Sequence, residues 1–295
     1  MAYHDGMEPG SPQHRRKRRR AAMRHAVFTR TPVRLSRGWI RPKKKFTANE
    51  RTVLLPNLPD ELCDLSIAHF SDLHVGELLT PAHLPYIVET TNRIGADLIA
   101  GTGDFIDFSN RYLDKVVEAM SELEAPLGCW FVLGNHDHLD NSAEVIAAFR
   151  EAGLGLLSDE GHLMEHRDRT IGVGGIDWSS KNTDDGPAVQ AAHQPMAKAD
   201  LKILLAHHPH VFDEACKHAI DLTLSGHTHG GQILFSTKRG RKGSIGLGNV
   251  GFRYTRGLYE RGNCRLHVSS GVGAWFPIRF RCPAEITRLV LENPY

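Results

Sequence analysis

Five short polar clusters in this sequence carry side chains that bind divalent metal ions in proteins. Together they supply carboxylate and amide oxygens and imidazole nitrogens, a donor set that suits borderline ions such as Mn, Fe and Zn. One such cluster alone is a weak signal, whereas five in order along the chain are specific. The clusters are Asp72-Leu73-His74, Gly103-Asp104, Gly134-Asn135-His136-Asp137, His207 and Gly226-His227-Thr228-His229.

Alternating strand and helix patterns surround the first three clusters. Apolar runs at 65–70, 97–100 and 129–133 predict strands, and amphipathic segments over 84–94 and 112–123 predict the helices between them. This order is typical of an α/β fold in which crossover helices connect parallel strands. Because ligands bind beyond the carboxyl ends of such strands, the clusters are expected at one functional edge.

The second half of the chain is richer in strands. Runs at 203–205 and 222–224 lead directly into the His207 and His227 clusters, and residues 212–219 predict a helix between them. The last ~35 residues alternate in short apolar runs, so we expect them to form a second sheet packed on the first.

Spacing within the clusters also favours a shared site. Residues i and i+2 of a strand point to the same side, so Asp72 and His74 could face one ion if strand geometry continues into the loop. The same argument applies to His227 and His229. Thiolate ligands are not indicated, because the five cysteines are odd in number and none forms a CxxC pair.

These motifs resemble those of the calcineurin-like metallophosphoesterases. The family patterns D-x-H, G-D, G-N-H-D, a lone H and G-H-x-H stand here as DLH, GTGD, GNHD, LLAHHP and SGHTHGG, and the resemblance spans residues 64–291. It implies an α/β fold, a two-sheet β-sandwich flanked by helices, with the active site at the carboxyl ends of strands. It also implies two divalent metal ions per chain, Mn, Fe or Zn, of which Mn is favoured.

The resemblance implies a role for each motif residue. A hydroxide bridging the two ions would be the nucleophile, because paired cations lower the pKa of a shared water. His136 would assist the leaving group, and Asp137 matches the residue that orients this histidine. Asp104 would bridge both ions, the first ion being held by Asp72, His74 and His229 and the second by Asn135, His207 and His227.

Two further histidines are candidates for substrate binding. His208 is adjacent to His207, and the family pattern places the ligand on the first of the pair, which leaves His208 for the substrate or for a supporting contact. His138 follows the GNHD motif and either touches the substrate or is an ordinary surface histidine.

The segment from Gly271 to Ile286, GVGAWFPIRFRCPAEI, resembles the closing segment of the YkuE/YaeI-like branch of the family, which is related to transmembrane proteins with a metallophosphoesterase domain. This resemblance implies a phosphodiester or pyrophosphate substrate, including lipid-linked ones such as UDP-2,3-diacylglucosamine in lipid A biosynthesis. Trp275 and Phe276 could line an apolar groove or pack as a loop. Arg279 and Arg281 could bind a second phosphate or be solvated.

The charge of the chain is divided between two regions. Residues 1–50 contain 14 Lys or Arg and 3 Asp or Glu, a net charge of +11, whereas the whole chain carries only +2. We therefore expect a basic, disordered arm over 1–50 and a catalytic domain over 51–295. The arm is either an inert solvated tail or a contact for an anionic membrane, and nucleic acid is not favoured because no reading motif accompanies the charge.

Localisation follows from the same region. Arg24, Arg30 and Arg34 interrupt the segment after the arginine run, so a twin-arginine export signal is not expected, and no apolar run reaches ~20 residues. The expectation is a cytoplasmic protein, with peripheral contact at the inner face of the membrane.

Two alternatives belong to other classes of function than a phosphoesterase of small substrates. One is a nuclease that uses the basic arm, and the other is a non-catalytic scaffold, which would have no need for the complete set of ligands.

Overall fold

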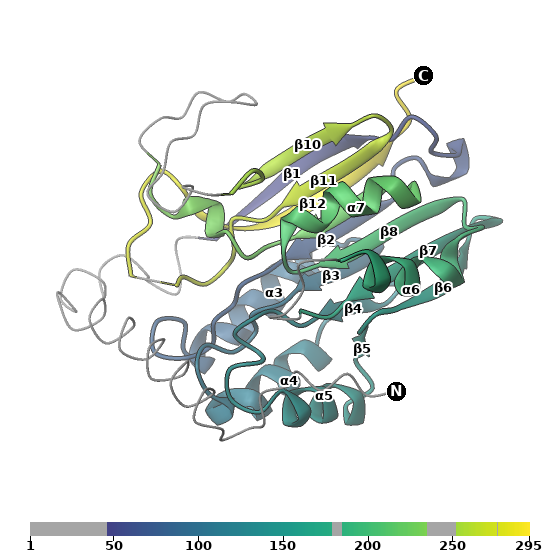
Figure 1. The fold of residues 1–295 in the computed structure, drawn as a ribbon. Coiled ribbons are helices and arrows are strands. Elements are labelled where there is room, and N and C mark those ends of the chain that lie inside the picture. The colour runs from purple at the N-terminus through teal and green to yellow at the C-terminus, as the bar shows by residue number, and fades with distance from the viewer. Residues whose placement is uncertain (1–45, 179–184, 235–251, 276) are drawn as a thin grey trace.

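The computed structural model describes residues 46–178, 185–234, 252–275 and 277–295. Within them the chain forms two six-stranded sheets that face each other, with helices on both outer faces (Figure 1). The α/β two-sheet sandwich flanked by helices, predicted from the sequence, is confirmed. The predicted arm lies outside the described residues over 1–45, and its last five residues, 46–50, belong to a strand instead.

The first sheet has the strand order β1-β12-β2-β3-β4-β5. Strands β2 to β5 are parallel to one another, whereas β12 runs antiparallel to β2 and parallel to β1. The strands are β1 (Phe46–Leu54), β2 (Ser66–Phe70), β3 (Leu98–Thr102), β4 (Cys129–Val132), β5 (Gly155–Leu156) and β12 (Ala284–Glu292).

The second sheet has the order β10-β11-β9-β8-β7-β6, in which β7, β8, β9 and β11 are parallel. Hairpin strands close both edges of this sheet. The strands are β6 (Glu160–His166), β7 (Arg169–Ile176), β8 (Leu201–Ala206), β9 (Leu222–Ser225), β10 (Gly257–Arg261) and β11 (Cys264–Val268).

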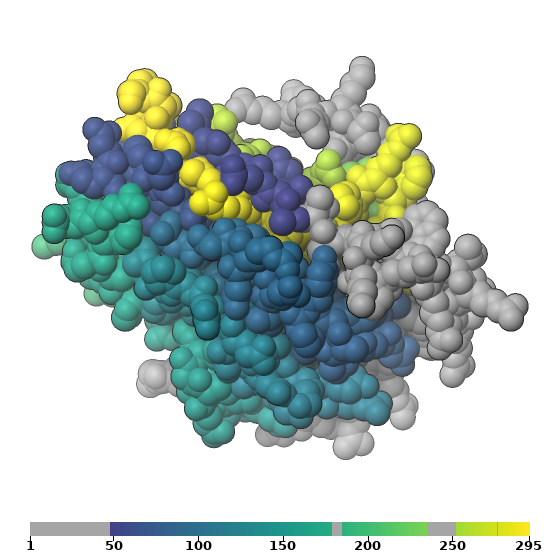
Figure 2. Space-filling model, turned by 180° about the vertical axis from the view of Figure 1, so that it is seen from behind, coloured from purple at the N-terminus to yellow at the C-terminus, as the bar shows by residue number. Residues whose placement is uncertain are grey.

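Strand β12 corrects one expectation from the sequence. The last ~35 residues were predicted to form the second sheet. Strand β11 does belong to it, but β12 inserts between β1 and β2 of the first sheet. Seen from behind, the yellow C-terminal residues accordingly lie among the purple and blue N-terminal ones (Figure 2). Alternating apolar residues predict a strand but not its neighbours, because sheet membership is decided by long-range pairing.

Helices cover the outer face of each sheet (Figure 1). The first sheet carries α3 (Leu84–Ile94), α4 (Leu113–Ser121) and α5 (Ser142–Glu151), and the second carries α6 (Gly186–Met196) and α7 (Phe212–Ala215). The helix predicted over 212–219 is shorter than expected, because a 3-10 turn over Cys216–His218 follows α7 and Ala219 adopts φ 51°.

The core consists of apolar layers on either side of each sheet. Along β2, Ile67 points between the sheets whereas Ala68 and Phe70 pack against the helices, which is the period-2 alternation of a strand buried on both faces. This packing fixes the two sheets against each other, so the carboxyl ends of β2, β3 and β4 lie near those of β8 and β9.

Candidate metal centre

The five polar clusters meet at the carboxyl ends of β2, β3, β4, β8 and β9. Asp72 lies two residues after the end of β2, and Asp104 lies two residues after the end of β3. The backbone N–H of Asp72 donates to the carbonyl of Gly103 at 2.9 Å. The backbone N–H of His74 donates in turn to the carbonyl of Asp104, also at 2.9 Å. Backbone hydrogen bonds alone therefore join the two loops.

The loops turn inward through left-handed backbone. Asp72 has φ 56°, His74 48° and Asp104 56°, and His227 and His229 have 69° and 50°. Five of the seven predicted ligands therefore adopt a conformation that is unfavourable for residues with a Cβ atom. Such strain persists only where surrounding contacts enforce it, and it concentrates at functional sites.

Three side chains form the first group of donors. Nε2 of His74 lies 3.0 Å from Nε2 of His229, and Nε2 of His229 lies 3.4 Å from Oδ1 of Asp72. All three side chains are buried. Two imidazole nitrogens and a carboxylate oxygen directed at one point match the donors that a divalent cation requires.

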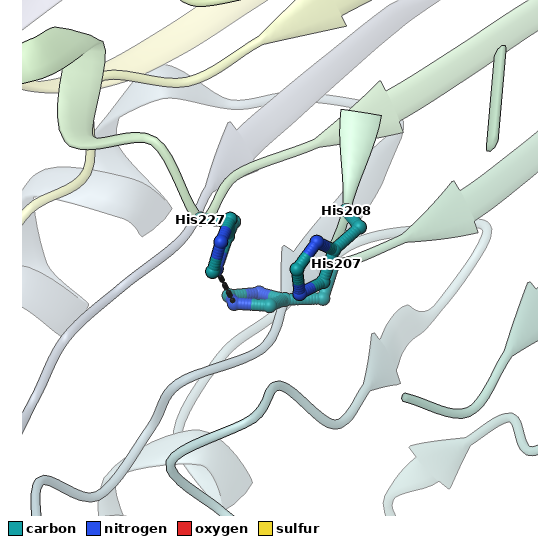
Figure 3. A group of neighbouring side chains, drawn as sticks. All are labelled: His207, His208 and His227. Carbon is teal, nitrogen blue, oxygen red and sulfur yellow. Dashed lines mark hydrogen bonds between the residues drawn. The ribbon is translucent and has the colours of Figure 1, made fainter. Parts of the chain in front are cut away.

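The second group lies on the other side of Asp104. Oδ1 of Asn135 lies 3.1 Å from Nε2 of His207 and 2.8 Å from Nδ1 of His227. The two imidazole nitrogens are 3.3 Å apart, and Figure 3 marks this approach between the rings. Nδ1 of His207 faces away and donates to the carbonyl of Thr102 at 2.7 Å, so Nε2 is the ring nitrogen directed at the other donors.

Asp104 connects the two groups. Its Oδ2 lies 3.4 Å from Nε2 of His74 and 3.3 Å from Nε2 of His207. Burial would raise the pKa of the Asp104 carboxyl, but His207 and His136 beside it hold that pKa well below its usual range. The structure therefore places an ionised carboxylate between two clusters of nitrogen donors.

The histidines of the site differ in charge. Burial would lower the pKa of His207, but Asp104 beside it raises that pKa to about 9, so a bound cation would take the place of its proton. Burial lowers the pKa of His227 to about 3, and it lowers that of His229 well below the usual value. Both rings are therefore neutral near pH 7, which is the form that donates a lone pair to a metal. The seven side chains predicted as ligands therefore lie together, and their assignment to two divalent ions stays a prediction.

His136 lies next to His74 of the first group of donors. Its Nδ1 donates to the backbone carbonyl of Asp107 at 2.7 Å, and the ring lies edge-on to His74 with centroids 4.4 Å apart. Burial would lower the pKa of His136, but the charges of Asp104 and Asp107 raise it to about 9. A protonated imidazole beside the donor clusters could act as a general acid.

Asp107 is a residue that the sequence reasoning missed. Its Oδ1 lies 3.4 Å from Nδ1 of His136 and 3.5 Å from Nδ1 of His74, so one carboxylate faces both rings. A carboxylate behind a histidine fixes the tautomer that leaves Nε2 available for a metal. The spacing Asp104-x-x-Asp107 within a loop that follows a strand is the sequence signal that could have identified it.

The side chain of Asp137 binds the backbone of two neighbouring loops. Its carboxylate accepts hydrogen bonds from the N–H groups of Asp104 and Gly134, both at 2.8 Å, and from those of Phe105 and Ile106. Burial raises its pKa to about 6. The carboxylate therefore joins the loops after β3 and β4, and the predicted orienting effect of Asp137 on His136 stays a prediction.

The two predicted substrate-binding histidines contact the end of β7. Nε2 of His138 lies 2.8 Å from Oδ1 of Asp177, and the indole N–H of Trp178 donates to Nε2 of His208 at 2.6 Å. The ring of His208 also stacks on that of His227, with centroids 3.7 Å apart. Asp177 and Trp178 were not singled out from the sequence, which offers no motif at that position.

The C-terminal segment also borders the site. The guanidinium of Arg279 donates to the backbone carbonyls of Ser270 at 2.8 Å and of Cys282 at 3.3 Å, so it binds the chain itself. Arg281 is exposed and lies over the ring of Phe280. Trp275 is 37 % exposed, whereas Phe276 lies outside the described residues.

Comparison with known proteins matches the sequence that forms this site to a family. The sequence model described as calcineurin-like phosphoesterase matches residues 65–231, which contain every predicted metal ligand. The chain belongs to the calcineurin-like phosphoesterase family. The resemblance inferred from the motifs is thereby confirmed, and the residues matched by the family model make up more than half of the chain.

Relatives of this phosphoesterase extend the match. An uncharacterized metallophosphoesterase of Helicobacter pylori strain J99 is 31% identical over 86% of the chain and 65% of its own length. YkuE of Bacillus subtilis, also an uncharacterized metallophosphoesterase, is 29% identical over 83% of the chain and 85% of its own length. The transmembrane protein with metallophosphoesterase domain of Danio rerio is 28% identical over 80% of the chain and 55% of its own length.

The phosphoesterase spans about two thirds of the length of the Helicobacter pylori relatives. Among residues 46–178, 185–234, 252–275 and 277–295, no helix is both long enough and apolar enough to span a bilayer.

Proposed function

We propose that this phosphoesterase hydrolyses a phosphodiester or pyrophosphate bond with two divalent ions at the described centre. The observation that carries the proposal is the position of Asp104, whose Oδ2 lies 3.4 Å and 3.3 Å from donor nitrogens of His74 and His207. A carboxylate shared between two donor clusters is the arrangement expected of a dinuclear site. When bound, the ions would activate water near neutral pH and offset charge on the phosphoryl oxygens.

Separate side chains would bind the two ions and donate the proton to the leaving group. Asp72, His74 and His229 would hold one ion, and Asp104 would contact both. His136, held by Asp107, would donate the proton that the leaving oxygen needs. The second ion would be held by Asn135, His207 and His227.

Manganese is the ion that we favour, with Fe and Zn as alternatives. The donors are nitrogen and oxygen atoms, and none of the five cysteines belongs to a candidate donor group of the described residues. Imidazole and carboxylate together suit all three ions. Metal content after purification, followed by reconstitution with each ion in turn, would identify the one that restores most turnover.

A lipid-linked substrate is the finer part of the proposal. Ile278 and Phe280 are 48% and 43% exposed, and Trp275 is also at the surface. Their segment is tied to Gln232, three residues after His229, because Gln232 accepts from the backbone N–H of Trp275 at 3.0 Å and of Phe280 at 2.8 Å. Exposed apolar side chains beside a phosphoryl site favour a substrate with an acyl chain, such as UDP-2,3-diacylglucosamine or a phospholipid.

The basic residues of 1–50 supply a second element of this proposal, contact with an anionic membrane at its cytoplasmic face. Clustered Lys and Arg each contribute about 1 kcal/mol near an anionic bilayer. Sedimentation with phosphatidylglycerol vesicles, with and without residues 1–45, would measure this contribution. Equal binding of both forms would assign the membrane contact to another surface or remove it.

The decisive experiment is a substrate screen with added Mn. Phosphodiesters, nucleotide-sugars and phospholipids would be compared with bis-p-nitrophenyl phosphate as a generic diester. We expect turnover of the generic diester and faster turnover of one lipid-linked compound. Absence of both bound metal and turnover would instead favour the scaffold, and preference for nucleic acid that depends on residues 1–50 would favour the nuclease.

A further inference from the structure

Two residues that follow β7 contact both histidines predicted to bind substrate. Asp177 meets His138, and Trp178 meets His208, in consecutive positions of one loop. The carboxylate oxygen of Asp177 only accepts, so Nε2 of His138 must carry the hydrogen in that bond. The indole nitrogen of Trp178 only donates, so Nε2 of His208 must be the unprotonated nitrogen.

The contacts therefore assign opposite tautomers to the two rings. A neutral His208 whose Nε2 accepts from Trp178 carries its hydrogen on Nδ1. A neutral His138 whose Nε2 donates to Asp177 keeps Nδ1 as a lone-pair nitrogen. The Trp178 contact is short, at 2.6 Å, and the His208 ring is further held by stacking 3.7 Å from His227.

The same contact distinguishes His208 from its neighbour His207. A ring nitrogen of His208 lies within 4.8 Å of ring nitrogens of His207 and His227, so proximity alone would admit it as a metal ligand. Figure 3 shows the three rings gathered together. Nε2 of His208, however, is already engaged by Trp178, and its Nδ1 carries the hydrogen, so neither nitrogen offers a lone pair to an ion.

We propose that Asp177 and Trp178 are positioning residues that fix His138 and His208 as opposite tautomers and turn the Nδ1–H of His208 into a donor for a phosphoryl oxygen of the substrate. The inference rests on the proposed function for the nature of that oxygen. It adds a substrate contact beside the second group of ligands, His207 and His227, and removes His208 from the coordination of the metal.

The test compares Trp178→Phe with Trp130→Phe in the full chain. Phenylalanine keeps a six-membered aromatic ring but removes the indole N–H together with the five-membered ring, a loss of ring area that the control variant shares. Trp130 is a matched control, because its N–H donates to the carbonyl of Leu127 at 3.0 Å and its ring lies 4.8 Å from that of His162. Zinc-loaded protein is used, since zinc is diamagnetic and preserves nitrogen NMR signals.

Nitrogen-15 NMR of the imidazole side chains reads the tautomers directly, with His208→Ala used to assign the signals. We expect a protonated Nδ1 for His208 in the native chain and in Trp130→Phe, and a shift towards protonated Nε2 in Trp178→Phe. A protonated Nε2 in the native chain, or the same His208 signals in native and Trp178→Phe protein, would overturn the assignment. This measurement needs no turnover, so it stands apart from failure of the proposed function.

Kinetics and metal content complete the test. With bis-p-nitrophenyl phosphate, Trp178→Phe should raise KM by about tenfold and leave kcat within about twofold, the pattern of a lost ground-state contact. Both ions should remain in Trp178→Phe and in His208→Ala. An unchanged KM would refute the donor role, and loss of one ion from His208→Ala would make His208 a ligand.

Discussion

Nδ1 of His136 lies 2.7 Å from the backbone carbonyl oxygen of Asp107 and 3.4 Å from a carboxylate oxygen of the same residue. One residue therefore both fixes the direction of the ring and favours its protonated form. The same carboxylate lies 3.5 Å from Nδ1 of His74, on the side of that ring away from the other predicted ligands. Asp107 consequently connects the proposed acid with the proposed metal site.

Asp107→Asn should weaken proton donation by His136 more than metal binding. The amide keeps the backbone carbonyl contact but removes the negative charge that raises the pKa of His136. Turnover of a diester with a poor leaving group should fall by about 10–100-fold, and p-nitrophenyl esters should be affected much less. Equal losses for both leaving groups would show that Asp107 acts on another step.

Asp104→Asn should disrupt the metal centre. Its carboxylate is the group that faces donors of both clusters, and an amide would supply weaker attraction to two cations. We expect loss of at least one ion per chain by elemental analysis and at least a 1,000-fold fall in turnover of a generic diester. Glu89→Gln, at an exposed helical position, serves as the control, and retention of two ions by Asp104→Asn would contradict the bridging role.

Gly273→Ala should destabilise the protein and displace the Asp72 loop. A Cβ atom at this position would lie 2.0 Å from the carbonyl oxygen of Leu73 and 2.7 Å from that of Asp72, and neither is a flexible side chain. We expect a loss of about 1–3 kcal/mol in the free energy of unfolding, together with weaker metal binding. Denaturant titration with and without Mn measures both effects.

Gly262→Ala is the matched comparison. Its Cβ atom would meet nothing within 4 Å, although its φ of 57° costs about 1 kcal/mol. Metal binding should be unchanged in this variant. If Gly273→Ala behaved like Gly262→Ala in both measurements, close packing of Gly273 on the Asp72 loop would not support the site.

The buried pair of His69 and His267 should make stability depend on pH. Their Nδ1 atoms lie 2.8 Å apart between the sheets. Burial lowers the pKa of His267 to about 3 and that of His69 well below its usual value. The unfolded chain therefore binds more protons than the folded chain below pH ~6.5, so stability is complete above that pH and falls by up to about 1.4 kcal/mol per pH unit for each group on acidification.

His267→Gln should make the fall between pH 6.5 and 4 shallower, because one of the two titrating groups is removed. The free energy of unfolding would be measured by urea denaturation across that range and compared with the native chain. His162→Gln, at an exposed histidine, should leave the slope unchanged. A slope for His267→Gln that equals the native one would mean that His267 is protonated in the folded protein.

The sequence by itself determined which polar side chains would gather and at which end of the strands they would lie. Asp72, Asp104 and Asn135 follow apolar runs that became β2, β3 and β4 almost as predicted, and His207 and His227 follow β8 and β9. These features depend on local patterns, because apolar periodicity and residue order are properties of short stretches of chain.

The spatial reason for convergence was different from the one expected. Strand geometry was expected to direct Asp72 and His74 to the same side, but both residues adopt left-handed backbone after β2 has ended. That conformation is enforced by hydrogen bonds to Gly103 and Asp104 of the neighbouring loop. A conformation imposed by a distant segment has no signature in the residues that adopt it.

Only the tertiary structure decided the remaining contacts. It placed β12 in the first sheet, set Asp107 between two imidazole rings, and brought Trp178 against His208. Each of these outcomes joins segments that the chain holds apart, and each depends on how two sheets pack and pair. The types of donor can be predicted from the order of residues. The contacts between residues far apart in the sequence depend on packing energy summed over the whole fold.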